Sequence, residues 1–200
     1  MTRETFDLDA FHPPQIIERI KADENEPFVP FTSTKDQLVP EFLPIGSQRL
    51  IRQTSSTHGT DGYITTDPGQ ILAMQNRLYA KLETAISSFT YFDEYLVPGS
   101  DTLVVAYGVT ARAAKAAVKK LQQQNNGASL LVLKTLWPVP EALIRKKAAP
   151  FKRVIMVEMN LGQYIREIRR LLPDKKIDFL GQMNGELIKP DQITEVFLNG

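Results

Sequence analysis

Polar side chains follow an apolar run in the stretch VIMVEMNLGQYIREI, residues 154–168. Glu158 closes the run, and Asn160 and Gln163 come after it. Open α/β sheets bind ligands at the carboxyl ends of their strands, so these residues are candidates for binding or for contact with a partner. Helix stability alone explains two of them, because Asn160 is a good N-cap and Gln163 can return a hydrogen bond to its amide. Glu158 needs solvent, a cation or a donor from another surface, because a carboxylate is costly at the end of an apolar strand.

A glycine turn opens a second stretch of this kind, YGVTARAAKAAVKKL, residues 107–121. Gly108 permits a tight turn, and Thr110 is a candidate N-cap for the alanine-rich helix that follows. Amides at such a helix N-terminus can hold a phosphate. Only one glycine is present, however, so neither the Rossmann fingerprint nor the P-loop is matched. A plain turn is the favoured interpretation, and phosphate binding at Gly108 and Thr110 is the alternative.

The only tryptophan, Trp137, lies between a predicted strand and the two prolines Pro138 and Pro140. The prolines end the strand, and Pro140 favours the start of a helix. Tryptophan is rarely buried completely and is enriched at interfaces. Trp137 therefore fits a partner surface as well as it fits the core.

Residues that carry out catalysis are not evident in the sequence. His58 lies in the glycine-rich polar loop SSTHGTDG, but no acid or nucleophile is placed with it by spacing. The absence of cysteine excludes disulfides, thiolate zinc sites, Cys-ligated iron–sulfur clusters and thiol nucleophiles. There is no nucleophile elbow and no metal-ligand cluster. We therefore predict no catalytic residue and no metal site in this chain.

An alternation of strands and helices predicts an α/β domain over residues 101–200. Continuous apolar strands such as TLVVAYG and RVIMVEM are typical of a mainly parallel sheet that is covered on both faces. Strands are predicted at 102–106, 129–133, 153–157 and 177–180, and helices at 110–123, 140–148 and 161–172. In the helix at 110–123, Ala114 and Ala117 belong to a small-residue face that can lie close to the sheet. In the helix at 161–172, Leu161, Ile165 and Ile168 belong to the expected buried stripe.

Residues 1–100 are predicted to form an irregular connecting segment with little core of its own. A short helix is expected at 13–22, and a turn-rich stretch follows it. The stretch RLIRQTSSTHGTDGYITT, residues 49–66, predicts a hairpin of two short strands. Asp67 and Pro68 then begin a helix that runs to about residue 87 and lies as a strut. The domain boundary is expected near Pro98.

The composition is that of an ordinary globular protein, with 42% apolar and 24% charged residues in a chain of 200. No apolar run approaches the roughly 20 residues that cross a bilayer, and the N-terminal stretch has no signal-peptide core. We therefore expect a cytoplasmic protein with no membrane contact. The net charge of +1 gives no reason to expect nucleic acid, and the basic cluster at 145–147 fits the end of a predicted helix.

Five stretches, taken in order, resemble the C-terminal part of the alpha subunit of 2-oxoacid:ferredoxin oxidoreductases of the 2-oxoglutarate and branched-chain type. They are EPFVPF, STHGTDGYITTDPGQILAMQNRLYAKLE, TLVVAYGVTARAAKAAV, LKTLWPVPEAL and RVIMVEMNLGQYIREI, and together they extend over most of the chain. The segment VEMNLGQ after a strand is the most specific of them. The resemblance implies a fold like the C-terminal domain of transketolase for residues 101–200, preceded by a connecting segment.

The resemblance also implies a function. Enzymes of that family oxidatively decarboxylate a 2-oxoacid, transfer the acyl group to coenzyme A and pass electrons through iron–sulfur clusters to ferredoxin. It implies that thiamine diphosphate, Mg²⁺ and the clusters are held by partner domains or subunits, and none by this chain. We expect a non-catalytic assembly or interface module within a dimer of heteromers. Its candidate contact residues are Glu158, Asn160, Gln163, Gly108, Thr110 and Trp137.

Three residues of the connecting segment are candidates for contact with coenzyme A. Arg49, Arg52 and His58 are chosen because they are polar and lie in or beside the predicted loop. The alternative function is a stand-alone small-molecule or nucleotide-binding regulatory domain that uses the turn from Gly108 to Thr110. Ligands would stabilise such a domain directly, whereas an assembly module would be stabilised mainly by its partner subunits.

Overall fold

A computed structural model describes residues 8–9, 12–13, 15–16, 18–54 and 56–200 of the chain. The contacts divide the chain into two compact units between Lys81 and Leu82, which precedes the boundary that the sequence placed near Pro98. Each unit is described by itself. None of the helices in the described part of the chain is long and apolar enough to cross a membrane.

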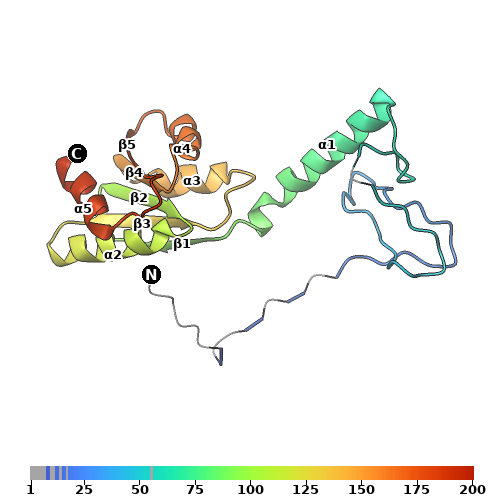
Figure 1. Cartoon of the computed structure of the whole chain (residues 1–200), viewed down its shortest axis with the longest axis horizontal. Coiled ribbons are helices and arrows are strands. Elements are labelled where there is room, and N and C mark those ends of the chain that lie inside the picture. The colour runs from blue at the N-terminus through green and yellow to red at the C-terminus, as the bar shows by residue number, and fades with distance from the viewer. Residues whose placement is uncertain (1–7, 10–11, 14, 17, 55) are drawn as a thin grey trace. The chain divides into compact units, whose positions relative to one another are not determined.

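The second unit is built around a five-stranded sheet with the order β1-β3-β2-β4-β5 (Figure 1). Strands β2 to β5 are parallel to one another, and β1 pairs antiparallel with β3 at the edge. Nearly every residue of the three central strands is buried, as their apolar sequences require. The strands are β1 (Phe92–Tyr95), β2 (Thr102–Tyr107), β3 (Ala128–Leu133), β4 (Arg153–Glu158) and β5 (Lys176–Gly181).

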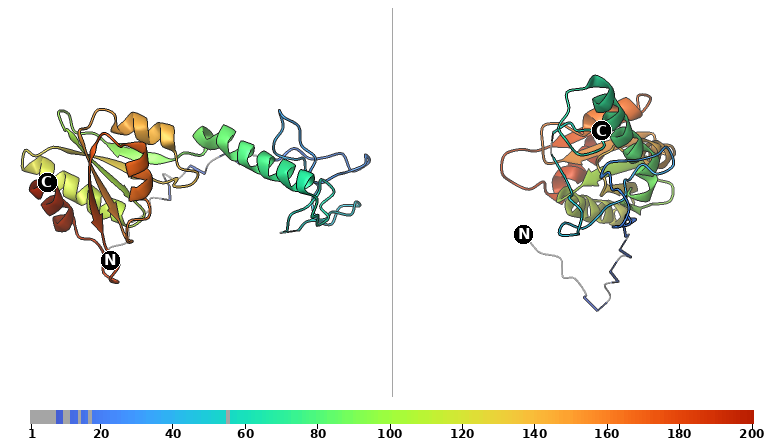
Figure 2. Two further views of the ribbon diagram at one scale, coloured as in Figure 1. Left: turned by 90° about the horizontal axis from the view of Figure 1, so that it is seen from above. Right: turned by 90° about the vertical axis from the view of Figure 1, so that its right-hand side faces the viewer.

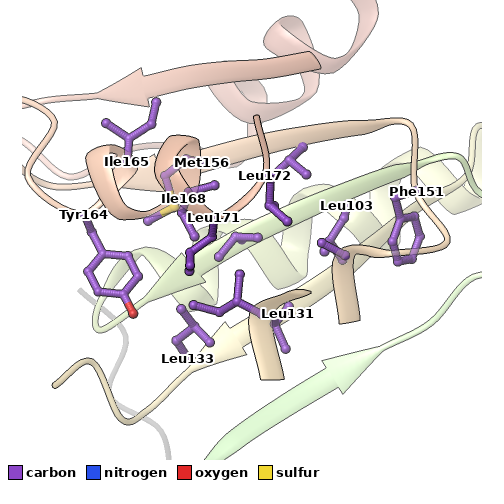
Figure 3. Close-up of a cluster of buried hydrophobic side chains, with 14 of the residues drawn as sticks. Leu103, Leu131, Leu133, Phe151, Met156, Tyr164, Ile165, Ile168, Leu171 and Leu172 are labelled. Atoms are coloured by element: carbon purple, nitrogen blue, oxygen red, sulfur yellow. The ribbon is translucent and has the colours of Figure 1, made fainter. Parts of the chain in front are cut away.

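Helices cover both faces of this sheet (Figure 2). They are α2 (Thr110–Gln123), α3 (Glu141–Ala148), α4 (Ile165–Leu171) and α5 (Pro190–Asn199). Helices α2 and α5 contact each other and share one apolar cluster with the sheet, whereas α3 and α4 contribute to the other. Figure 3 shows part of the second cluster, in which Ile168 and Leu171 of α4 lie beside Met156 of the sheet. The predicted fold class is therefore confirmed: an α/β fold with a mainly parallel sheet flanked by helices.

The connections define a switch point at the carboxyl edge of the sheet. From β2 the chain crosses through α2 to β3 on one side, and from the neighbouring strand β4 it crosses through α4 to β5 on the other side. The two crossovers lie on opposite faces of the sheet. The chain thus leaves β2 and β4 in opposite directions, which is the arrangement that opens a crevice for ligands in open α/β sheets.

The first unit has one long helix, α1 (Pro68–Ala85), which crosses the boundary and is followed by the short 3₁₀ helix η1 (Ile86–Ser88). The helix start predicted at Asp67 and Pro68 is confirmed, because the Gln70 amide donates to Asp67 Oδ1 at 2.8 Å. The helix predicted at 13–22 is wrong for residues 18–22, where Lys21 forms a bridge with Phe42 instead. Residues 14 and 17 of that stretch lie outside the described part.

The hairpin predicted at residues 49–66 is reduced to a single antiparallel bridge between His58 and Ile64 among the described residues. Backbone bonds at Gly59 and Gly62 close a tight turn inside this bridge. Gly62 has a φ of +82°, and a Cβ there would lie 2.8 Å from the Arg52 carbonyl oxygen. The glycine signal therefore identified the turn correctly, but too few ladder bonds form to make two strands.

Candidate functional site

The Glu158 side chain lies at the switch point, where the sheet meets the start of α4. It is 0% exposed, and each of its hydrogen bonds comes from a donor within the chain. Its Oε2 accepts from the Tyr107 hydroxyl at 2.8 Å, from Asn160 Nδ2 at 2.9 Å and from the Tyr164 amide at 3.0 Å. Its Oε1 accepts from the Ile165 amide at 3.1 Å. The sequence predicted that this carboxylate needs a partner, and the structure supplies the donors internally.

This set of donors explains how a carboxylate can be buried without a cation. Four donors satisfy its two oxygens, and two of them are amides at the N-terminus of α4, where the helix dipole favours negative charge. The same environment changes the pKa of the Tyr107 hydroxyl. Burial first, then the hydrogen bond to Glu158 and its charge, raises the pKa of Tyr107 to about 12, and the bond from Asn160 opposes the shift.

Asn160 holds the turn that separates β4 from α4. Its Oδ1 accepts from the Gly162 amide at 2.8 Å and the Gln163 amide at 2.9 Å, while its Nδ2 also donates to the Tyr107 hydroxyl at 2.8 Å. The predicted helix-capping role of Asn160 is wrong, because its side chain closes the turn before α4 and Tyr164 is the N-cap of the helix. The predicted helix start was too early, because Glu158 caps the amides of Tyr164 and Ile165 and α4 begins only at Ile165.

The expected buried stripe of α4 needs one correction. Ile165 and Ile168 are buried as predicted, but Leu161 lies in the turn before the helix and is 79% exposed. Leu161 is exposed because it precedes the first helical residue, so the helical spacing that would turn it inward does not apply.

Tyr164 extends the polar cluster into the core. Its ring meets that of Tyr107 edge-on with centroids 5.6 Å apart, and its side chain is almost fully buried. Its hydroxyl has no hydrogen-bond partner among the described residues. Burial, with the nearby charge of Glu167, raises the pKa of this hydroxyl. Figure 3 shows the hydroxyl pointing toward the end of β3 at Leu133.

Thr110 does not cap α2 as predicted. It is the first residue of the helix, and its hydroxyl donates to the carbonyl oxygens of Tyr107 at 2.7 Å and Val157 at 3.2 Å. Thr110 therefore ties the ends of β2 and β4 together and is buried. Gly108 is exposed with a φ of +56°, and a Cβ there would meet nothing within 4 Å, so the glycine serves the turn.

Besides Gly108, the predicted contact residues Trp137 and Gln163 are exposed at this edge. Trp137 is 77% exposed in the loop after β3, and Gln163 is exposed in the turn after β4. Other large apolar residues are exposed in the loops that follow the parallel strands. We refer to Val109, Trp137, Leu161 and Met183, one from each of these four loops, as the carboxyl-edge residues.

The three candidates for coenzyme A contact lie in the first unit, and the structure does not gather them in one hollow. Arg49 donates to the carbonyl oxygens of Glu24 and Asn25, at 2.8 and 2.9 Å. The Arg52 guanidinium stacks 3.9 Å above the ring of Tyr63. His58 stacks on Phe31 with centroids 4.0 Å apart and lines a hollow together with Arg77.

Tyr107, Tyr164 and Arg77 were missed by the sequence analysis. A signal for Tyr107 was present, because Tyr107 and Glu158 end neighbouring parallel strands one residue beyond the paired Ala106 and Val157. Counting the register from the predicted strands would have placed the hydroxyl beside the carboxylate. No comparable signal exists for Arg77, whose surroundings come from loops without regular structure.

The residues present offer no evident site for a metal ion. Among the described residues, no group of three or more His, Asp or Glu side chains could hold one. The chain also lacks cysteine, the usual ligand of iron–sulfur clusters. The donors around Glu158 instead neutralise a buried charge by hydrogen bonding, and they hold the loops at the switch point in one arrangement.

Comparisons with known proteins agree on one group of enzymes. Residues 100–193 match the family model "Pyruvate:ferredoxin oxidoreductase core domain II". The chain is 30% identical over 175 residues to the 2-oxoglutarate synthase subunit KorA of Methanothermobacter thermautotrophicus, a match that covers 86% of this chain and 46% of the relative. It is 32% identical over 117 residues to the ketoisovalerate oxidoreductase subunit VorB of the same organism, covering 58% of this chain and 32% of the relative.

A solved structure has the same fold. It is a 2-oxoglutarate:ferredoxin oxidoreductase from Magnetococcus marinus, with a TM-score of 0.78, 20% sequence identity, and coverage of 92% of this chain and 32% of that chain. That enzyme has 2-oxoglutarate, coenzyme A and succinyl-CoA bound. The chain thus spans about half the length, or less, of the relatives it matches.

Proposed function

Because the chain is related to the alpha subunits of 2-oxoacid:ferredoxin oxidoreductases, with a core domain II at residues 100–193, we propose that it is an assembly module of such an enzyme. In this proposal the complete enzyme is thiamine-dependent and converts a 2-oxoacid to an acyl-CoA. Other polypeptides hold thiamine diphosphate, Mg²⁺ and the iron–sulfur clusters. This chain supplies surfaces on which they assemble, and it is not active alone.

The observation that carries the proposal is the lack of a core in the first unit. Leu43 is the only large apolar side chain that is buried among the described residues up to Lys81. The exposed large apolar side chains of this unit are Leu8, Ile16, Ile20, Val29, Val39, Ile45, Leu50, Tyr63, Ile64, Leu72 and Tyr79. Soluble monomers rarely leave so much apolar surface uncovered, and exposed surface of this kind is typical of protein interfaces. A partner that covers it would supply the burial that the unit itself lacks.

The second unit offers a further contact surface in the carboxyl-edge residues. The order of the strands in the sheet puts these residues in the spatial order Trp137, Val109, Leu161, Met183, along about 15 Å of the sheet edge. At the opposite edge, the loops that enter β3, β4 and β5, at 124–127, 149–152 and 172–175, expose no large apolar side chain, and the loop that enters β2 exposes Leu96 alone. The difference favours the carboxyl edge as a contact surface, with Trp137 as its anchor and Gln163 exposed on the same edge.

The buried residues at this edge have a different role in the proposal. The polar atoms of Glu158 and Thr110 form hydrogen bonds within the unit, and these bonds hold the loops in place. They support the contact surface without touching the partner. Of the six residues that the sequence put forward for contact, we therefore retain Trp137, Gln163 and the exposed turn at Gly108, with Asn160 half-buried between them.

Association with the thiamine-binding polypeptide from the same source tests the proposal. We expect the triple variant Ile45→Asp, Leu50→Asp, Ile64→Asp to bind that polypeptide at least about tenfold more weakly in a titration. The reason is that each large apolar side chain contributes roughly 1.5–3 kcal/mol when buried. The three residues are exposed in the free chain, so its unfolding free energy should change little.

Leu198→Asp is the matched control, because Leu198 is an exposed apolar residue near the end of α5 and lies outside both proposed surfaces. Its binding should equal that of the unchanged chain. Equal affinity of the triple variant and the unchanged chain would remove the first unit from the proposed interface.

Coenzyme A contact by Arg49, Arg52 and His58 remains a separate part of the proposal. It is supported by their polarity and by the half-exposed loop in which His58 lies. Titration of coenzyme A into the reconstituted complex should show weaker binding for the variant in which all three residues are alanine. The same affinity for both complexes would argue that coenzyme A is bound elsewhere.

A further inference from the structure

A hollow of about 490 Å³ lies within the first unit, between one face of α1 and two loops. The helix contributes Gln70, Met74 and Arg77, which recur at helical spacing on one side. The loop at Phe31 is fixed to the tight turn by the hydrogen bond from its amide to the Thr60 carbonyl oxygen at 2.9 Å. The volume is that of a small-molecule site.

One end of the hollow is cationic. Arg77 is half-buried and donates through Nη1 to the Leu38 carbonyl oxygen at 3.2 Å, but no carboxylate pairs with it in the part of the chain that the structure describes. Burial lowers the pKa of this guanidinium, as expected for a cation that lacks a counter-charge. Four of its five N–H donors remain free for a ligand.

His58 lies beside this end and lines the hollow as well. Its Nδ1 is 2.8 Å from the Gly59 carbonyl oxygen, which can only accept, so Nδ1 carries the hydrogen. Its ring is held against Phe31, with centroids 4.0 Å apart. His58 and Arg77 also line a second hollow, whereas Asp61 and Gln70 line only the first. His58 and Arg77 are therefore assigned to the same end of the first hollow.

The other end of the hollow is formed by acceptors. Gln70 Oε1 and Asp61 Oδ1 lie 2.6 and 3.0 Å from the point that a Cβ on Gly59 would occupy. Asp61 accepts from the Tyr63 amide at 3.0 Å and forms no ion pair among the described residues. Arg77 follows Gln70 by two helical turns, which corresponds to about 10 Å of rise. The hollow therefore has an unpaired anion at one end and an unpaired cation at the other.

We propose that this hollow binds a small polar molecule with an anionic group at the Arg77 end and an ammonium or hydroxyl group at the Asp61 end. Asp61 disfavours a ligand that is purely anionic, and Arg77 disfavours one that is purely cationic. His58, Asp61 and Arg77 are the titratable side chains that line the hollow, so the charges are matched by a ligand of both polarities. The proposal does not depend on assembly of the chain into an enzyme.

Calorimetric titration of the full chain with three probes tests the pairing of the two ends. The probes are 6-aminohexanoate, which carries both groups, and hexanoate and hexylamine, which carry one each. We expect 6-aminohexanoate to bind at least about tenfold more tightly than either single-ended probe, because it engages both charges. Arg77→Met and Asp61→Asn should each remove that advantage, and Arg77→Lys should restore part of it.

Controls of matched charge are available in the second unit. Arg166→Met and Asp174→Asn change exposed residues outside the hollow and should leave the binding of 6-aminohexanoate unchanged. Circular dichroism of each variant separates loss of binding from loss of structure, since Arg77 also bonds to the backbone at Leu38. Equal binding of the three probes, no binding of 6-aminohexanoate, or full binding by Arg77→Met or Asp61→Asn would overturn the proposal.

Discussion

At the scale of single residues, the central feature is a buried carboxylate that is stabilised by neutral donors. Glu158 is matched by a tyrosine hydroxyl, an asparagine amide and two backbone amides. Each of the four groups donates to Glu158, so a side chain whose oxygens accept suits the site. The network joins β2, β4 and the start of α4 at one point.

Replacing Glu158 by glutamine tests this matching. The amide group of glutamine would place N–H donors against a donor of the site, leaving buried polar groups unsatisfied at a cost of about 1–3 kcal/mol. We expect Glu158→Gln to lower the free energy of unfolding by that amount in urea denaturation. Glu195→Gln, at an exposed position on α5, is the control and should change it by less than about 0.5 kcal/mol. A Glu158→Gln protein as stable as the control would contradict the network.

The raised pKa of Tyr107 gives a second prediction at this scale. The folded protein holds this hydroxyl protonated up to about pH 12, whereas an ordinary tyrosine ionises near pH 10.0. Its contribution to stability is therefore present below pH 10 and is lost as the pH rises toward 12. A spectrophotometric titration should show one fewer late-ionising tyrosine in Tyr107→Phe than in the unchanged chain. Loss of a tyrosine that titrates near pH 10 would contradict the assignment.

Sequence reasoning identified Glu158 as a carboxylate in need of solvent, a cation or a donor from another surface, whereas its donors come from within the chain. Asn160 was identified because a capping residue acts on amides only a few positions away, although the amides that it binds precede α4. Tyr107 is far from Glu158 in sequence, and only the pairing of β2 with β4 brings the two side chains together. The role of Thr110 was wrong for the same reason, because one of its two acceptors belongs to the neighbouring strand.

At the scale of elements, α2 is the helix whose packing follows most directly from its sequence. Its predicted bounds are confirmed, and Ala114 and Ala117 are completely buried against the sheet and α5. Small side chains let the helix approach the strands closely. The neighbouring Ala116 is exposed, so the helix offers a matched pair of alanines, one buried and one exposed.

A larger side chain should destabilise the protein at the buried alanine, Ala117, and have little effect on stability at the exposed alanine, Ala116. We expect Ala117→Leu to destabilise the protein by about 1–3 kcal/mol, because the added atoms overpack the contact with the sheet. Ala116→Leu should change the unfolding free energy by less than about 0.5 kcal/mol. Thermal or urea unfolding of the two variants makes the comparison, and equal effects would show that the face assignment is wrong.

The sequence analysis missed α5, although Pro190 at its start is a helix signal, and it missed the edge strand β1, which has a weak pattern. Strand β1 has only four residues and no alternation of apolar and polar side chains. It lies at the edge of the sheet and pairs only with β3. Its sequence FDEY offers two acids where a strand signal needs apolar residues, and tertiary pairing with β3 decides its structure. The four strands with continuous or nearly continuous apolar runs were all found, because burial on both faces leaves little else that such runs can be.

At the scale of the whole molecule, the two units differ in how much of their apolar surface they bury. The second unit buries two apolar clusters and has an internal partner for its one buried carboxylate. The first unit keeps most of its large apolar side chains exposed, and the chain matches only about half of its curated relative's length. This difference was visible in the sequence as an irregular, proline-rich first half, but the extent of exposure required the structure.

Whether this chain is an assembly module of a larger enzyme can be measured by reconstituting the complex. The chain would be co-expressed with the thiamine-binding and iron–sulfur polypeptides from the same source and examined by native mass spectrometry, followed by an assay of 2-oxoacid-dependent ferredoxin reduction. We predict a stable complex that contains the chain and an activity that is lost when the chain is omitted. A chain that stays alone while the other polypeptides are active without it would contradict the claim.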